Sequence, residues 1–200
     1  MNSKSKESFD QLADRYDSWF DRHAAVFQSE LEALKKVIPT HSRGLEIGVG
    51  SGRFAQDLGI KTGVESSEKL REMAKVRGIN VSEGSAGSIP FANERFDFVL
   101  FNTVLCFLDA PVKALSEAKR VLKSNGILII GMIDRNSPLG QSYVTRKQDN
   151  PFYRDAHFYS VDEVMVLINQ SGFVQKEIYQ TVFSPLEKIL TPEPVKPGYG

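Results

Sequence analysis

From about residue 40 onward, short apolar runs alternate with amphipathic segments. The runs lack the period-two alternation of a half-exposed strand, so each is predicted to be a strand buried on both faces; they span 45–49, 62–65, 79–82, 96–101 and 126–133. Helical spacing predicts helices between them over 54–58, 67–77 and 111–122, the last opened by Pro111. This alternation predicts an α/β fold, a Rossmann-like, doubly wound, mostly parallel sheet with helices on both faces.

The N-terminal segment has a different pattern. Phe9, Leu12, Tyr16 and Phe20 recur at helical spacing and predict a helix over 7–20. A second helix is expected over 27–38, where Pro39 ends it. We expect residues 1–40 to form an added helical lid and residues 41–133 to form the cofactor-binding core.

The C-terminal third is less regular. Residues 134–160 are polar and aromatic, and we expect an irregular insertion on the acceptor side. A helix over 161–171 and a strand over 173–179 are predicted within 161–184, followed by an irregular, proline-rich tail over 185–200. No repeat or linker divides the chain, so residues 1–200 are expected to form one domain.

Composition narrows the partner classes. Lys+Arg and Asp+Glu each number 25, so the net charge is zero and no positive field favours nucleic acid. Cys106 is the only cysteine, which excludes an intramolecular disulfide and a Cys-rich metal site and suits a cytoplasmic protein. We expect no metal, no membrane span and no secretory signal; the oligomeric state stays open.

The segment with the clearest chemistry is the glycine turn after the first strand. Gly48, Gly50 and Gly52 let the chain turn tightly and let a ligand lie against bare backbone. The spacing G-x-G-x-G differs from the dinucleotide fingerprint G-x-G-x-x-G, which disfavours NAD or FAD. A purely structural turn is the alternative.

Glu65 ends the second strand, seventeen residues after Gly48. A carboxylate there can accept hydrogen bonds from both hydroxyls of a ribose. The alternative is a solvated charge at the sheet edge.

These segments, in this order, resemble the class I S-adenosylmethionine-dependent methyltransferases of the UbiE/type 11 kind over roughly residues 9–180. The matching stretches are the first motif at 45–52, the second-strand motif at 63–67, the adenine loop at 83–91, the fourth strand at 96–102, the turn into strand five at 122–128, and the stretch from 157–160 to 172–173.

The resemblance implies S-adenosylmethionine as cofactor. It places Gly48, Gly50 and Gly52 beneath the methionine part, with Glu46 orienting its amino group and Glu65 holding the ribose. The remaining implied contacts are the Ala86 backbone amide on adenine, Ser66 and Ile89 beside the ring, Ser85 toward the adenine amino group, and Asn102 and Thr103 near the sulfonium.

The sequence departs from the family twice. Ser85 stands where an acid usually binds the adenine amino group, so that contact lacks charge assistance. The family also ends in a hairpin that enters the sheet, whereas only one good strand follows the last predicted helix here.

The expected reaction is in-line methyl transfer to an N, O or C nucleophile of a small-molecule acceptor. A general base is needed only if the acceptor must lose a proton; the candidates are Tyr16, Asp134, Tyr143 and His157. A cofactor-binding module without catalysis and, less favoured, a dinucleotide-binding enzyme are the alternatives.

Overall fold

The computed structural model describes residues 3–199, which fold around one five-stranded parallel sheet. The strands lie in the order β3-β2-β1-β4-β5. Their bounds are β1 (Gly44–Ile47), β2 (Thr62–Glu65), β3 (Asn80–Glu83), β4 (Phe96–Asn102) and β5 (Leu122–Gly131). The predicted doubly wound fold is confirmed.

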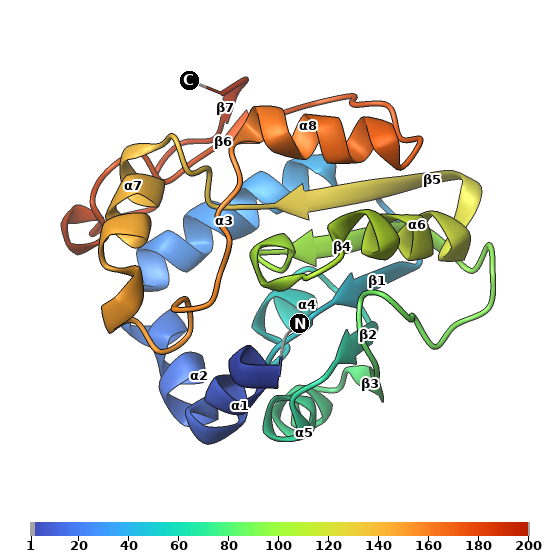
Figure 1. Ribbon diagram of the computed structural model, residues 1–200, viewed down its shortest axis with the longest axis horizontal. Helices are drawn as coiled ribbons and strands as arrows, with labels where there is room; N and C mark the ends of the chain where they lie inside the picture. The colour runs from blue at the N-terminus through green and yellow to red at the C-terminus, as the bar shows by residue number, and fades with distance from the viewer. Residues whose placement is uncertain (1–2, 200) are drawn as a thin grey trace.

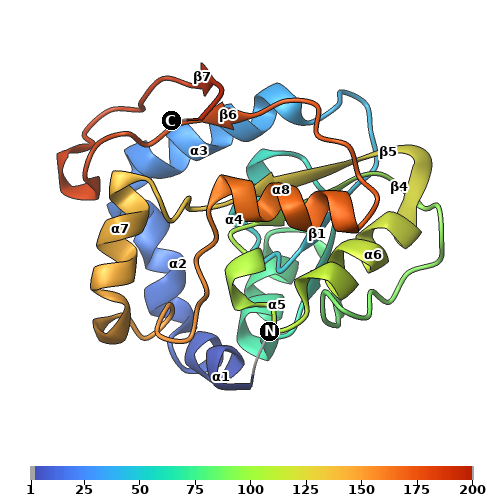
Figure 2. The same ribbon diagram turned by 45° about the horizontal axis from the view of Figure 1, so that its top comes forward.

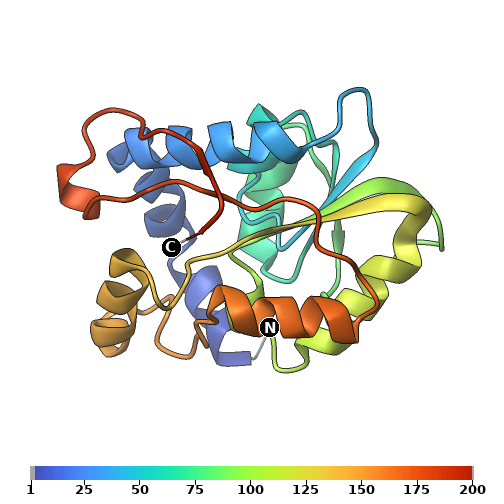
Figure 3. The same ribbon diagram turned by 90° about the horizontal axis from the view of Figure 1, so that it is seen from above.

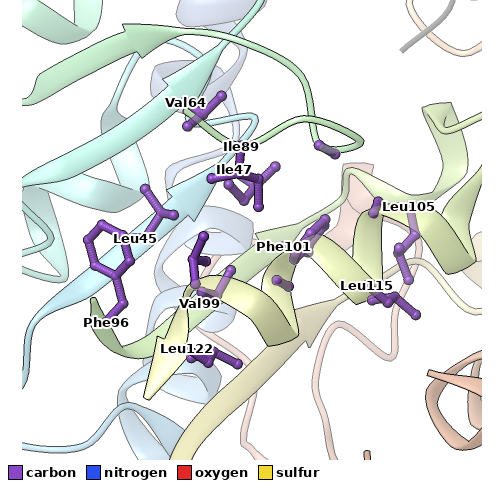
Figure 4. Packing of buried hydrophobic residues seen from close by; sticks show 14 of the residues in the cluster. Leu45, Ile47, Val64, Ile89, Phe96, Val99, Phe101, Leu105, Leu115 and Leu122 are labelled. Atoms are coloured by element: carbon purple, nitrogen blue, oxygen red, sulfur yellow. The ribbon is translucent and has the colours of Figure 1, made fainter. Parts of the chain in front are cut away.

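Helices cover both faces of the sheet, as the view from above shows (Figure 3). On one face lie α6 (Pro111–Val121) and α8 (Val161–Gln170); on the other lie α3 (Ala24–Val37), α4 (Arg53–Asp57) and α5 (Glu68–Val76). Leu45, Ile47, Val99 and Phe101 point to the α6 face (Figure 4), while Phe98 and its neighbours on that side of the sheet point to the other. Strands buried on both faces explain why the apolar runs are continuous.

The predicted helix over 7–20 is in fact two helices, α1 (Ser3–Gln11) and α2 (Ala13–Arg22). Leu12 leaves the helical region with φ −116° and ψ 26°. The break lets α1 pack on α5 while α2 turns toward the glycine turn, which one straight helix could not do.

Residues 134–160 are more ordered than expected. They contain α7 (Pro138–Thr145) and the 3-10 helix η2 (Lys147–Asp149). Ser137 caps α7 by accepting a hydrogen bond from the Gly140 amide at 3.0 Å, and Pro138 occupies its first turn. Gly140 weakens the helical signal, yet a Cβ there would meet the Asp134 carbonyl oxygen at 1.9 Å. Glycine is therefore required by close packing at this point.

The expected strand over 173–179 is also wrong. Only the short strand β6 (Tyr179–Gln180) forms, and it lies outside the main sheet. It pairs antiparallel with β7 (Lys196–Pro197), which lies in the tail that was expected to be irregular. The segment between them, which includes η3 (Leu186–Lys188), runs along α3 (Figure 2), where Val182 and Ile189 pack on Val26. Burial against α3 thus holds this segment there.

Two smaller differences complete the description. β5 covers Leu122–Gly131 rather than 126–133, because the expected turn within 122–128 is instead an irregularity in the pairing of β5 with β4. A short 3-10 helix, η1 (Leu105–Phe107), follows β4. Of the helices within residues 3–199, none is both long and apolar enough to cross a membrane.

Candidate active site

The glycine turn joins β1 to α4 through three left-handed residues. The φ values of Gly48, Gly50 and Gly52 are +66°, +56° and +85°. At Gly50, a Cβ would meet the Tyr16 hydroxyl at 2.9 Å. Backbone strain and lack of space therefore both exclude a side chain here.

Glu65, at the tip of β2, is tied to this turn. Its carboxylate accepts hydrogen bonds from the amides of Gly50 (3.0 Å) and Ser67 (2.8 Å). Burial raises its pKa, and these hydrogen bonds oppose the rise. Oε1 also accepts from the Ser66 hydroxyl at 3.4 Å, whereas Oε2 retains a lone pair for a further donor.

Glu46 lies on the central strand β1, one residue before the strand ends, and its side chain is 2% exposed. Among residues 3–199, its Oε2 atom has no hydrogen-bond partner. Burial, and then the charge of Glu65, raise the pKa of Glu46 well above its ordinary value. A buried carboxylate in this position favours a cationic ligand group.

Thr103 follows β4 with a φ of +56°, a strained value for a residue with a branched Cβ. Its amide donates to the Gly131 carbonyl oxygen at 2.8 Å and so continues the parallel pairing of β4 and β5 by one residue. Such strain concentrates at functional sites.

A cavity of about 120 Å³ lies at the carboxyl edge of the sheet. A single water needs roughly 10–15 Å³ by the same measure, so the cavity has room for a small molecule. Its lining extends from α2 to α7, which stand beyond the arrowheads of β4 and β5 (Figures 1 and 2). Of the residues singled out in the sequence, the lining includes Tyr16, Glu46, Gly48, Asn102, Thr103 and Tyr143.

The residues expected around adenine lie outside this cavity. Ser66 follows Glu65 on the β2 tip, and Ser85 is exposed after β3. Ala86 and Ile89 are 5% and 4% exposed and belong to the core cluster on the α6 face. The cavity therefore covers only part of the expected site.

Two catalytic candidates do not face the cavity. His157 is exposed, because Ala156 and Phe158 on either side point inward and the chain alternates there. Asp134 accepts from the Asn136 amide at 3.0 Å and shapes the turn before α7. His157 and Asp134 are therefore not among the residues that line this cavity.

The structure adds an acid that the sequence motifs miss. Glu30, on α3, lines the cavity together with Phe152 and Tyr153 from the loop after α7. Burial raises the pKa of Glu30 to about 7. The sequence could have indicated Glu30, because it lies four residues after Val26 and four before Leu34, on the helix face where both are buried.

An ion-pair network fixes α2 beside the glycine turn. Arg53 donates to both Asp17 oxygens at 3.0 and 2.8 Å and to both Asp21 oxygens at 2.6 and 2.8 Å. The Arg77 guanidinium donates to the Ser51 carbonyl oxygen at 2.7 Å and to the Asp17 carboxylate at 2.8 Å. These ion pairs hold α2 against the segment 51–53 at the end of the glycine turn.

Comparison with known proteins gives consistent results. The family model of a methyltransferase domain matches residues 45–130. An uncharacterised protein of Methanocaldococcus jannaschii is 48% identical, with 96% of this chain and 93% of the relative covered. The demethylmenaquinone methyltransferase of Thermobifida fusca is 25% identical, with 84% and 81% covered.

A solved structure from Thermotoga maritima resembles the whole chain. It is described as a SAM-dependent methyltransferase and possible histamine N-methyltransferase. The identity is 44% and the TM-score 0.94, with 97% of this chain and 93% of that chain covered.

Proposed function

Since the chain belongs to the class I S-adenosylmethionine-dependent methyltransferases, we propose that it methylates a small-molecule acceptor bound in the cavity between α2, α3 and α7. When bound, S-adenosylmethionine supplies a methyl group already activated by a positively charged sulfur. The protein's task is then to hold the acceptor nucleophile in line with that methyl group and to exclude water.

The observation that carries this proposal is the continuity of the cavity. Its lining begins at Glu46 and Gly48, passes Asn102 and Thr103, and ends at Tyr143. Residues expected to touch the cofactor and residues outside the family motifs therefore face one space. Cofactor and acceptor can meet there without crossing the core.

The residues present fit the cofactor. The unpartnered Oε2 of Glu46 suits the cofactor's ammonium group, and the remaining lone pair of Glu65 Oε2 suits a ribose hydroxyl. The left-handed Gly48 and Gly50 carry no side chain of their own, so a ligand that takes the place of the Tyr16 ring could lie against the main chain. We propose Ser66, Ser85, Ala86 and Ile89 for the adenine side on the resemblance alone.

Among N, O and C acceptors, the description of the Thermotoga maritima neighbour supports nitrogen. We also keep the cytoplasmic location as a prediction, supported by the single, half-buried Cys106, which suits a reducing compartment.

The test is direct. Purified protein is titrated with S-adenosylhomocysteine by calorimetry and then incubated with S-adenosylmethionine and a panel of amines, phenols, quinols and carboxylates. We expect micromolar binding and release of S-adenosylhomocysteine with at least one acceptor class. Binding without turnover on the whole panel would favour a non-catalytic module, and bound NAD would favour a dinucleotide enzyme.

We further propose that α1 and α2 act as a lid. Tyr16 lies over Gly50, and the cavity lining includes Gly48 but neither Gly50 nor Glu65. A ligand that reaches Glu65 must therefore displace Tyr16. The alternative is a permanently docked segment, which the Asp17–Arg53 ion pair favours.

Trp19 separates these two possibilities, because it is the only tryptophan and it lines the cavity. With a lid, saturating S-adenosylhomocysteine shifts or quenches Trp19 emission and slows proteolysis between residues 3 and 22. An unchanged spectrum and an unchanged cleavage rate would establish the static helix.

A further inference from the structure

Glu30 is the feature of the cavity that the methyltransferase motifs do not explain. Its side chain lines the cavity from α3. Among residues 3–199, it makes no hydrogen bond or ion pair. An acid in such a place costs stability unless a ligand compensates it.

The surroundings of Glu30 are aromatic. Its negative charge contributes to raising the pKa of the hydroxyls of Tyr16, Tyr143 and Tyr153, so all three lie within its electrostatic reach. The same cavity is lined by Phe152 and Trp19. Aromatic faces attract cations, and a carboxylate among them strengthens that attraction.

The charges in the lining exclude an anionic occupant. Arg53 is the only basic residue that lines the cavity among the described residues, and Asp17 and Asp21 occupy its guanidinium. Glu30 and Glu46 are then the acids of the lining without a basic partner, and a bound cation would favour the charged form of each. Because Glu46 already serves the ammonium group of the cofactor, Glu30 is available to a second cation.

We infer that Glu30 binds the protonated nitrogen of a small amine acceptor, whose apolar body packs against the tyrosine and phenylalanine rings. This inference rests on the proposed function and specifies its acceptor class. An ammonium must lose one proton before its lone pair can accept a methyl group. The N–H bond breaks, the proton passes to a Glu30 oxygen as an O–H bond forms, and water later takes the proton.

The experiment compares two ligands of one shape, 2-phenylethylamine and 2-phenylethanol. Each is titrated at pH 8 into the full chain, with and without S-adenosylhomocysteine, by calorimetry and Trp19 fluorescence. We expect the amine to bind at least tenfold more tightly than the alcohol. Glu30→Gln should remove that difference and leave the alcohol within twofold.

Glu32→Gln is the matched control, since Glu32 lies on the same helix but is exposed and paired with Lys35. It should behave as wild type. Equal binding of amine and alcohol to the wild-type chain would overturn the inference, and this readout does not depend on how well Glu30→Gln folds.

Retention of the amine preference in Glu30→Gln would also overturn it. So would an equal loss of S-adenosylhomocysteine affinity, which would assign Glu30 to the cofactor. Failure of the wild-type chain to bind S-adenosylhomocysteine would instead contradict the proposed function, whatever the amine selectivity.

Discussion

The two halves of the candidate site are built in different ways. The cofactor half lies within residues 46–65 and depends on main-chain conformation: three left-handed glycines and a carboxylate bound to the Gly50 and Ser67 amides. The proposed acceptor half depends on the side chains of Glu30, Tyr143 and Tyr153. Glu30 lies on α3, more than a hundred residues before Tyr143 on α7 and Tyr153 in the loop that follows.

This difference decides how each half tolerates change. A main-chain site admits few substitutions, because its geometry needs particular backbone angles. A side-chain site can change its residues while the helices keep their packing, which lets acceptor choice vary on a constant cofactor site. Variants in the first half should therefore lose the cofactor, and variants in the second should change acceptor use only.

The largest effect is expected at Gly50. Gly50→Val places a branched side chain at a φ of +56° and against Tyr16, and should weaken S-adenosylhomocysteine binding at least about 100-fold. Calorimetry measures the dissociation constant of S-adenosylhomocysteine in each variant. Gly59→Val is the control, since Gly59 has a similar φ of +71° with nothing within 4 Å. Equal losses in both would mean that backbone strain alone is responsible.

A smaller effect is expected at Glu65. Glu65→Ala removes hydrogen bonds to a charged group and should weaken S-adenosylhomocysteine binding by about 1.5–3 kcal/mol. Glu72→Ala, on α5, is the control, because Glu72 is exposed and lies outside the stretches that resemble the family's motifs. Unchanged affinity in a folded Glu65→Ala protein would remove Glu65 from the ribose site.

Glu30 should make stability depend on pH. Its pKa is about 7 in the folded protein against an ordinary 4.5, so the folded state binds more protons between these values. Stability therefore falls as pH rises from 4.5 through 7. Relative to Glu30→Gln, the wild type should lose about 1–2 kcal/mol between pH 5 and pH 8, allowing for its partial exposure.

Chemical denaturation at both pH values measures this difference. The other titratable groups lining the cavity are Tyr16, Glu46, Arg53, Tyr143 and Tyr153. They remain in both proteins and largely cancel in the comparison. Parallel pH profiles for wild type and Glu30→Gln would show that Glu30 stays ionised throughout.

The smallest effect is expected in the acceptor half. Tyr143→Ala should reduce turnover about fivefold through loss of acceptor positioning, with S-adenosylhomocysteine affinity within twofold. His157→Ala should change neither, because His157 is exposed outside the cavity. Steady-state kinetics measures turnover of both variants, and calorimetry measures their cofactor affinity. A loss of cofactor affinity in Tyr143→Ala would show that Tyr143 also belongs to the cofactor site.

The strands were predictable because their signal is local. A strand buried on both faces needs a continuous apolar run, and a glycine turn needs glycines at consecutive alternate positions, so 45–52 and Glu65 could be identified in the sequence. The segment 134–160 gave no such signal. Its helix α7 is held by Ser137 capping and by packing of Gly140 on Asp134, which periodicity does not register.

The sequence by itself determined the sheet, its parallel topology and the cofactor turn, since backbone preference and apolar period act over a few residues. Tertiary structure alone decided that Leu12 breaks the first helix, that His157 is exposed, and that Glu30, Tyr143 and Tyr153 line one cavity. Contacts between distant residues follow from how helices pack on the sheet. No local pattern contains that information, so the acceptor half became visible only in the folded chain.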